Sequence, residues 1–324
     1  NNSKKLNEMK IALDFDPDYI NNYLPEFLQD IHGKIPLDIF YKYNMNNDVY
    51  EIVANGKTKF FTAYSPLLGL DHNYDDGDIS FKINSDIKKN EMIEFLFDSK
   101  KLNIFMELFT KDRKINEIVI HRINSPLQDF NALISKKGNI WDTIIKGEKI
   151  NLEKYFENIN DINEDKDFKY NLKFKLDINE IIFKKKSIKS PILNGFLLNG
   201  KFEEFEFRYI NDVNEHLIKI DNKVKKKEFL VKSNDASELF DIFDLHPNTK
   251  GGLLDIKGHK DYHDLEYSGN IMLKNFVAYD TPFFTKVLTL FSLDGLEQKL
   301  KGGGIYFDTL QSKYKFENHS LQIQ

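Results

Sequence analysis

The sequence predicts a mainly β protein. An extended, curved antiparallel sheet is expected to form an open, taco-like apolar groove, with a few short amphipathic α-helices at its edge or mouth. Residues 169–178 alternate strictly between polar and apolar side chains, as expected for a strand with one buried and one solvated face. The same alternation recurs in residues 11–15, 37–43, 79–83, 205–209 and 310–316. Turn-forming dipeptides separate several of these runs, and only three segments show the 3.6-residue period of a helix.

Each predicted strand has one apolar face, which is typical of antiparallel sheets with one side toward a core or ligand. In residues 169–178, Lys173 and Lys175 lie on the polar face. The side chains that we expect to line the groove are Tyr170, Leu172, Phe174, Leu176, Phe205, Phe207 and Tyr209. The expected turns are Asn55-Gly56, Asp76-Gly77, Asn199-Gly200 and Glu317-Asn318.

Amphipathic helices are predicted over residues 17–31, 235–245 and 281–300. Ser233 or Asn234 can cap the second helix, and Thr281 followed by Pro282 marks the start of the third. The third helix carries the candidate lid residues Phe283, Phe284, Val287, Leu288 and Phe291. This stripe is expected to pack on the strand that contains Ile305 and Phe307, or to face a membrane or ligand at the mouth of the groove.

The chain is expected to form two segments: residues 1–157, which are β-rich with one helix, and residues 158–324. The boundary lies in the acidic stretch 158–167, which could equally be a long hairpin loop within one continuous sheet. An internal repeat is a further hypothesis, because an offset of 219 places residues 33, 35 and 37 on residues 252, 254 and 256 with glycine and aliphatic residues retained. The absence of an initiator methionine leads us to treat the chain as a segment of a longer protein.

Composition narrows the functional classes. The 324 residues include 46 basic and 51 acidic side chains but no cysteine, which excludes disulfides, thiolate metal sites and cysteine nucleophiles. Only Arg113, Arg122 and Arg208 are arginines. Nucleic-acid binding is therefore disfavoured, because guanidinium groups make most bidentate contacts to phosphates and guanine. No run reaches the roughly 18 apolar residues that a membrane-spanning helix needs.

Motifs for catalysis are missing from the sequence, which has no G-x-S-x-G, P-loop, H-E-x-x-H or G-x-G-x-x-G pattern. Two series that begin like calcium loops, at Asp14 and Asp71, have Tyr19 and Asp76 where glycine is required. We therefore expect no enzyme, no catalytic residue, no cofactor and no resident metal.

Two weaker metal hypotheses remain open. A loose cation site could form around Asp75, Asp76 and Asp78. His259 and His263 would face one metal if they lay on a helix, but flanking strands favour a solvated hairpin loop.

Five features of the last third arrive in a characteristic order. A capped helix leads to a strand with Gly251-Gly252, and a glycine-containing strand pair follows. A hydrophobic helix then ends in the break Leu-Asp-Gly-Leu at 293–296, and the next strand begins Gly-Ile-Tyr-Phe-Asp at 304–308. Over residues 229–323 this series resembles the AsmA-like C-terminal region of bacterial envelope proteins. Residues 150–156 resemble an upstream strand-end element of such proteins, although the chain carries Lys, Asn and Phe where many relatives carry Arg, Ala and Leu.

The resemblance implies a place and a ligand. AsmA-like proteins are anchored in the inner membrane and extend into the periplasm, where several are thought to guide phospholipids toward the outer membrane. By resemblance, we expect a periplasmic segment that shelters or guides phospholipid acyl chains. Its anchor to the inner membrane would lie in a part of the parent protein outside this sequence. The expected partners are phospholipid or another apolar ligand and envelope proteins, and no nucleic acid.

A second functional class stays open, in which the chain is a structural or interaction module that supports outer-membrane assembly. In that case the apolar sheet face is simply the core of the protein. The two classes differ in whether the apolar faces are covered. Three short helices are too few to cover every predicted strand, which favours an open groove.

Overall fold

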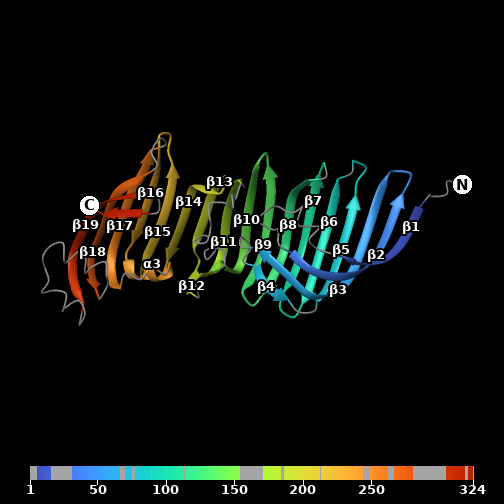
Figure 1. Cartoon of the computed structure of the whole chain (residues 1–324), viewed down its shortest axis with the longest axis horizontal. Helices are drawn as coiled ribbons and strands as arrows, with labels where there is room; N and C mark the ends of the chain where they lie inside the picture. The colour runs from blue at the N-terminus through green and yellow to red at the C-terminus, as the bar shows by residue number, and fades with distance from the viewer. Residues whose placement is uncertain are drawn as a thin grey trace. The chain divides into compact units, whose positions relative to one another are not determined.

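A computed structural model of the chain describes residues 6–15, 31–65, 70–74, 77–88, 90–112, 114–153, 171–183, 186–211, 213–243, 245, 248–261, 266–279, 304–317 and 320–323. These residues are mainly strands, and they divide into two compact units, Asn1–Ile182 (unit 1) and Phe183–Gln324 (unit 2). Each unit is an open, curved and almost wholly antiparallel sheet (Figure 1). The predicted fold class is confirmed.

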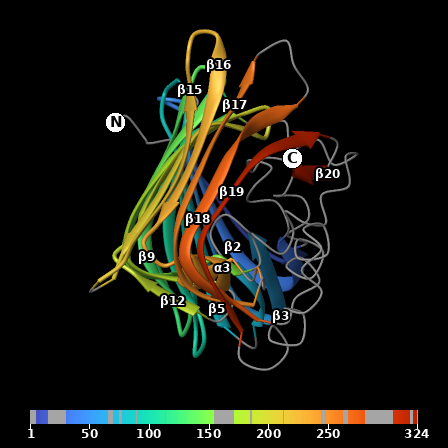
Figure 2. The same cartoon turned by 90° about the vertical axis from the view of Figure 1, so that its left-hand side faces the viewer.

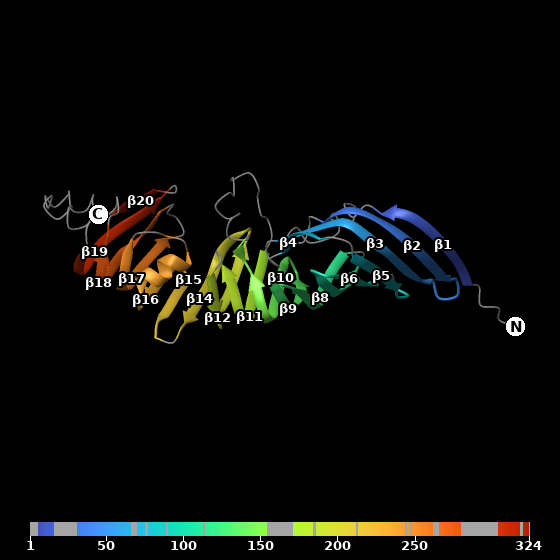
Figure 3. The ribbon, with the colours of Figure 1, turned by 90° about the horizontal axis from the view of Figure 1, so that it is seen from below.

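Unit 1 holds the strands β1 (Leu6–Phe15), β2 (Ile31–Asn44), β3 (Val49–Ser65), β4 (Leu70–Tyr74), β5 (Gly77–Ser85), β6 (Glu91–Ser99), β7 (Asn103–Lys111), β8 (Lys114–Ser125), β9 (Gln128–Lys137), β10 (Ile140–Asn151) and β11 (Asn171–Phe183). The last residue of β11, Phe183, belongs to unit 2. Most strands pair with their neighbours in the chain. The long strand β3 pairs with β5 through residues 51–58 and with β4 through residues 61–65. The curvature of β1, β2 and β3 is visible in Figure 3.

One pair of strands departs from the antiparallel expectation. Ile140 pairs with Asn171 and Asn151 with Ile182, so β10 and β11 run parallel. Parallel neighbours need a crossover connection rather than a hairpin. The alternative in which residues 158–167 form the loop of a hairpin is therefore wrong, although those residues themselves lie outside the described part of the chain.

Unit 2 holds the strands β12 (Lys186–Lys189), β13 (Ile192–Leu198), β14 (Lys201–Ile210), β15 (Glu215–Asn222), β16 (Lys226–Ser233), β17 (Thr249–Asp261), β18 (Tyr267–Ala278), β19 (Ile305–Glu317) and β20 (Ser320–Ile323), with the helix α3 (Ala236–Ile242) between β16 and β17. From β13 to β20 each strand pairs antiparallel with the next. The predicted turn at Asn199-Gly200 is confirmed. Both residues have positive φ, 51° and 74°, as a two-residue type I′ hairpin requires.

The helix α3 is the one expected over residues 235–245, and its N-cap is Asp235 rather than Ser233 or Asn234. The Asp235 carboxylate accepts a hydrogen bond from the Glu238 N–H at 3.2 Å. The Ser233 hydroxyl oxygen instead accepts from the Asp235 N–H at 3.0 Å, ahead of the first helical residue. The N-cap is therefore one residue beyond Asn234 and two residues beyond Ser233.

Replacement of the cap should cost stability. We expect Asp235→Ala to lower the free energy of unfolding by about 1 kcal/mol, the usual effect of removing an acidic N-cap. The matched control is Asp241→Ala on the same helix, whose carboxylate makes only an exposed ion pair with Lys186 at 3.2 Å. The control should stay within about 0.5 kcal/mol of the wild type. Urea denaturation measures both variants, and equal losses would show that the cap adds nothing.

A line of backbone irregularities bends β17 and its neighbours around α3. Gly251, Gly252 and Asn275 have positive φ values of 67°, 104° and 54°, and the paired rows skip Gly252 and Asn275. The Gly251 N–H donates to the Ser237 hydroxyl at 3.1 Å, which ties the bend to the helix. Beyond the bend, Phe276 is fully buried in the core beside α3. The curved strands β18 and β19 are seen in Figure 2.

One predicted turn is wrong. Asn55-Gly56 lies inside β3 rather than between two strands. A side chain at Gly56 would place its Cβ 2.2 Å from the Pro36 carbonyl oxygen on β2, so the glycine allows close approach of two strands.

Several predictions fall on residues that the structure does not describe. They include almost all of the helix 17–31 and the whole helix 281–300. The turns at Asp76-Gly77 and Glu317-Asn318 are described only at Gly77 and Glu317, which begin and end strands. The candidate site residues outside the described part are Tyr170, Phe283, Phe284, Val287, Leu288 and Phe291.

Candidate functional site: two apolar sheet faces

One face of the unit 1 sheet carries unbroken rows of apolar side chains across the strands. The central row, from β1 to β11 without β4, is Ile11, Ile39, Ala54, Phe81, Phe95, Met106, Ile120, Ala132, Ile145 and Leu176. A flanking row runs from Leu13 to Ile178, and another runs from Met9 to Phe174. We call these three rows the inner face of unit 1. Apart from Thr143, their members are aliphatic, aromatic, methionine or glycine.

Exposure falls along these rows from one side of the unit to the other. On β1, which pairs only with β2 among the described strands, Met9, Ile11 and Leu13 are 49%, 39% and 38% exposed. On β8 and β10, Ile118 and Ile145 are fully buried. Contiguous exposed apolar surface on a soluble protein is usually a binding site. Among the described residues, the side of the inner face that includes β1 has the most exposed apolar side chains of that face.

Unit 2 has a comparable face with a different cover. Its two central rows, from β13 to β19, are Leu193, Phe207, Ile218, Val231, Ile256, Ile271 and Ser312, and Gly195, Phe205, Ile220, Phe229, Gly258, Gly269 and Tyr314. We call these rows the inner face of unit 2. Just beyond α3, Phe243 packs its ring on those of Phe183 and Phe207, with centroids 5.6 and 5.8 Å apart. The helix end therefore closes one end of this face, while much of the second row stays half-buried.

A buried polar cluster joins α3 to the sheet beneath it. His216 is fully buried, and its Nδ1 lies 2.8 Å from the Ser233 hydroxyl. Its Nε2 lies 3.3 Å from a carboxylate oxygen of Glu238, an ion-pair distance without hydrogen-bond geometry. The Glu238 carboxylate also accepts hydrogen bonds from the side-chain amides of Asn211 and Asn214, at 2.6 and 3.0 Å.

This cluster has the residue types of a Ser–His–acid triad, but the hydrogen bond between serine and histidine has the opposite donor and acceptor. The one proton of the Ser233 hydroxyl goes to the Asp235 carbonyl at 2.6 Å, so the Ser233 oxygen accepts from the Nδ1–H of His216. A general base would need that nitrogen as an acceptor. The arrangement is suited to holding α3 in place rather than to activating Ser233.

The end of the unit 2 inner face that lies away from α3 is cationic. The Lys227 ammonium donates to the Phe202 carbonyl at 2.8 Å and pairs with Glu203 at 3.1 Å. The Lys260 ammonium lies over the ring of Tyr267, 5.3 Å from its centroid. Burial, and secondarily the Glu203 carboxylate, raise the pKa of the Tyr267 hydroxyl above its usual value. The apolar face thus ends in a mixed cationic and aromatic border.

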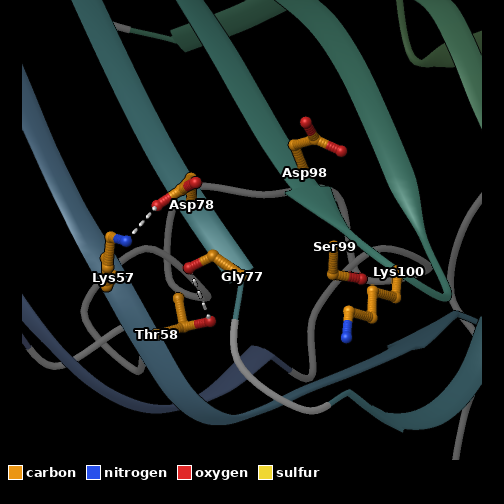
Figure 4. A pocket seen from close by; sticks show the side chains of 7 residues that line it. All are labelled: Lys57, Thr58, Gly77, Asp78, Asp98, Ser99 and Lys100. Carbon is orange, nitrogen blue, oxygen red and sulfur yellow. Dashed lines mark hydrogen bonds and ion pairs between the residues drawn. The ribbon is translucent and has the colours of Figure 1, made fainter.

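A polar hollow opens beside the middle of β3, at the start of β5 and the end of β6 in unit 1 (Figure 4). Its lining residues are Lys57, Thr58, Gly77, Asp78, Asp98, Ser99 and Lys100. Lys57 pairs with Asp78 at 3.5 Å, and the Thr58 hydroxyl donates to the Gly77 carbonyl at 3.4 Å. Two ammonium groups and two carboxylates balance, and the lining has no large apolar side chain. The hollow therefore suits neither an acyl chain nor a highly charged ion.

Comparison with protein-family models, curated proteins and solved structures gives no significant match to this chain. The AsmA-like resemblance therefore stays a prediction.

The described groove candidates lie on the apolar sides of the two sheets, within the inner-face rows or, for Leu172 and Tyr209, one row beyond them. Leu172, Phe174 and Leu176 are at the buried side of the unit 1 face, while Lys173 and Lys175 are exposed on the opposite side of the sheet. The predicted alternation in β11 is confirmed from Leu172 to Ile178, whereas Asn171, expected on the solvated face, is buried.

The other candidate strand, β14, belongs to unit 2. Phe207 is buried beneath the ring of Phe243, and Phe205 and Tyr209 are half-buried. The three side chains come together on one face, as the alternation predicts.

The exposed members of the unit 1 rows and the His216 cluster were not singled out from the sequence. Alternation is equally strong in buried and exposed strands, so it cannot rank Ile11 above Leu172. His216 and Ser233 do occupy inward positions of alternating strands. A polar residue at an inward position was the one signal that could have located the cluster.

The metal hypotheses fall partly on described residues. Asp78 is paired with Lys57, and His259 is exposed on β17, whereas Asp75, Asp76 and His263 are not described. Within the described ranges, no three His, Asp or Glu side chains are grouped as metal ligands. None of the described helices is long and apolar enough to cross a membrane.

Proposed function

We propose that this chain is a non-enzymatic segment of a bacterial envelope protein that shelters or guides phospholipid acyl chains along the inner faces of its sheets. The observation that carries the proposal is the unit 1 inner face, whose apolar rows run from β1 to β11 and remain 38–49% exposed on β1. The resemblance over residues 229–323 supports a periplasmic location, with the inner-membrane anchor in another part of the parent protein.

The chemistry of the face suits an acyl chain. Its rows offer a continuous aliphatic and aromatic wall in which Thr143 is the one hydroxyl besides that of Tyr41. Burial of an alkyl chain on such a wall is favourable by about 25 cal/mol per Å² of apolar area. A ligand held in this way binds through its area, so unit 1 should select weakly among head groups.

A second candidate function is a structural or interaction module of the envelope. The fully buried side chains of β8 and β10, such as Ile118 and Ile145, favour it, because that part of the face already serves as a core. The two functions make different demands on β1. A ligand-binding face uses the exposed side chains there, whereas a structural module has no use for lipid contact.

Site-specific crosslinking separates the two. The photoreactive amino acid p-benzoylphenylalanine is placed at Ile11 on the inner face or at Ala12, the next residue of β1, on the outer face. Both positions are exposed, so they differ mainly in the face they present. With phospholipid vesicles, we expect about fivefold more lipid adduct at position 11 than at position 12.

Organic extraction of the purified chain gives a second measure, because a lipid-sheltering protein should retain phospholipid that mass spectrometry detects. Equal adduct at both positions together with no retained lipid would contradict the proposal and leave the structural module in its place.

A further inference from the structure

The polarity of the unit 2 inner face changes in one direction along its strands. On β17 the inward residues run Leu254, Ile256, Gly258, Lys260, and the first of these lies in the core beside α3. At about 3.3 Å per residue, the distance from the helix-covered end to Lys260 is about 20 Å. On β16 the inward series also ends in a lysine, Lys227, which lies opposite Lys260. The face is therefore apolar along its length and cationic at the end away from the helix.

Within the described part of the chain, the positive charge at this end is not fully balanced. Two ammonium groups, those of Lys227 and Lys260, share one carboxylate, that of Glu203, which pairs with Lys227. Among the described residues, Lys260 has no carboxylate at ion-pair distance, and its contact is with the Tyr267 ring.

Two lysines on the opposite face of the same strands are paired with carboxylates. Lys257 pairs with Asp255 at 3.1 Å, and Lys226 pairs with Glu228 at 2.9 Å. Lys257 therefore differs from Lys260 in having a carboxylate partner, although both lie on β17.

A hydroxyl without a partner lies one row closer to the apolar part of the face. The ring of Tyr314 lies across Gly258 and Gly269, and a Cβ added to Gly258 would be 2.0 Å from the Tyr314 hydroxyl oxygen. Tyr314 is 6% exposed, and its hydroxyl has no hydrogen-bond partner in the described structure. Burial also raises the pKa of this hydroxyl, so it remains a donor at neutral pH. A buried donor without an acceptor costs stability that phenylalanine would not cost.

We propose that the end of the unit 2 inner face at Lys260 is a subsite for the anionic head of an amphiphile, with Lys260 as its cation and Tyr314 as a hydrogen-bond donor at the junction of head and tail. The tail lies along the apolar rows toward α3. This inference rests on the proposed function and adds a ligand class and an orientation to it. The class is a phosphate ester that carries a long alkyl or acyl tail, because its anionic oxygens suit an ammonium group and its ester oxygen can accept from Tyr314.

Titration of the purified full chain at low ionic strength tests the subsite. The probes, kept below their critical micelle concentrations, are dodecyl phosphate, dodecyl maltoside with the same tail and a neutral head, and inorganic phosphate without a tail. We expect dodecyl phosphate to bind about tenfold more tightly than dodecyl maltoside, and the preference to shrink as salt screens the ammonium group. Inorganic phosphate should bind far more weakly than dodecyl phosphate.

Two variants locate the preference. Lys260→Ala should reduce the preference for dodecyl phosphate to about twofold or less while binding of dodecyl maltoside stays the same. The matched control is Lys257→Ala on the same strand but the outer face, which should keep the full preference. Unit 1 has an apolar face of its own, to which both dodecyl probes can bind. The contribution of the unit 2 subsite is therefore measured as the change in preference between the wild type and Lys260→Ala.

Tyr314→Phe gives an independent readout. Dodecyl phosphate should bind this variant several-fold more weakly, although its urea midpoint should equal or exceed that of the wild type. A residue needed only for folding would not combine weaker binding with unchanged or higher stability.

The other outcomes overturn the inference in distinguishable ways. If both dodecyl probes bind equally and Lys260→Ala changes neither, the proposed function stands and the subsite is wrong. If inorganic phosphate binds as tightly as dodecyl phosphate, the site is an anion site that does not use the tail. If neither dodecyl probe binds, the proposed function fails, and the subsite fails with it.

Discussion

Phe174→Asp should lower the free energy of unfolding by about 4 kcal/mol, whereas Lys173→Asp should change it by less than about 0.5 kcal/mol. Phe174 is 8% exposed and lies opposite Thr143, a fully buried residue of β10. Loss of a buried phenyl ring costs about 3–5 kcal/mol by itself. The new carboxylate adds a desolvation cost, which some water access through the exposed edge of the ring will reduce.

Urea denaturation followed by circular dichroism measures both variants, and Phe174→Leu serves as an intermediate that keeps the apolar character. The leucine variant should lose about 1–2 kcal/mol, well short of the aspartate variant. Lipid occupancy, measured by extraction, should be nearly unchanged in the leucine variant, because Phe174 lies in the buried part of the face. Equal tolerance of aspartate at positions 173 and 174 would contradict the register of β11.

Alternation predicted which face of a strand is apolar, but not where the alternation shifts. In β8 the inward residues Ile118 and Ile120 are followed by Ile123, because the ladder with β7 is irregular between Phe105 and Met106. Asn275 causes a similar shift in β18. Such irregularities depend on the fit between neighbouring strands, which a single segment of sequence does not reveal.

The positions of turns and the directions of strands also depend on neighbouring strands, so single segments of sequence did not predict them reliably. Asn-Gly at 199–200 and Asn-Gly at 55–56 are the same dipeptide, yet only the first forms a hairpin. The second lies inside β3, where the Pro36 carbonyl oxygen of β2 comes too close for any side chain. The parallel pairing of β10 with β11 was missed because strand direction depends on the path of the connection and not on the alternation of either strand.

The candidate site was predicted in outline. The residues with the clearest alternation, such as Leu172, prove to be buried, while the exposed part of the same face lies on β1 at Ile11. Exposure is set by what packs over a face, so periodicity does not determine it. The inward lysine at 260 was visible in the sequence, but its place at the end of an apolar row depends on the pairing of β16, β17 and β18.

Gly269→Ala should lower the free energy of unfolding by about 3 kcal/mol, although alanine is otherwise the better residue in a strand. A Cβ at this position would lie 2.0 Å from the Lys257 carbonyl oxygen and 2.6 Å from the Cα of Gly258. Both are backbone atoms, so no change of rotamer relieves the overlap, and the strands β17 and β18 must separate. Ser268→Ala, one residue away on the other face, should stay within about 0.5 kcal/mol of the wild type.

Gly258→Ala should behave differently, because the atom nearest to its Cβ, at 2.0 Å, is the hydroxyl oxygen of Tyr314. Without that oxygen the nearest atoms are the Ser268 carbonyl oxygen and the Tyr314 Cζ, both at 3.1 Å. We therefore expect Gly258→Ala to cost about 2 kcal/mol in the wild type and less than about 1 kcal/mol when combined with Tyr314→Phe. Gly269→Ala should cost the same with or without Tyr314→Phe, because its overlap is with backbone. A double-mutant cycle by urea denaturation measures the coupling. Rescue of both glycine variants, or of neither, would show that the Tyr314 ring does not lie across these two glycines as the structure places it.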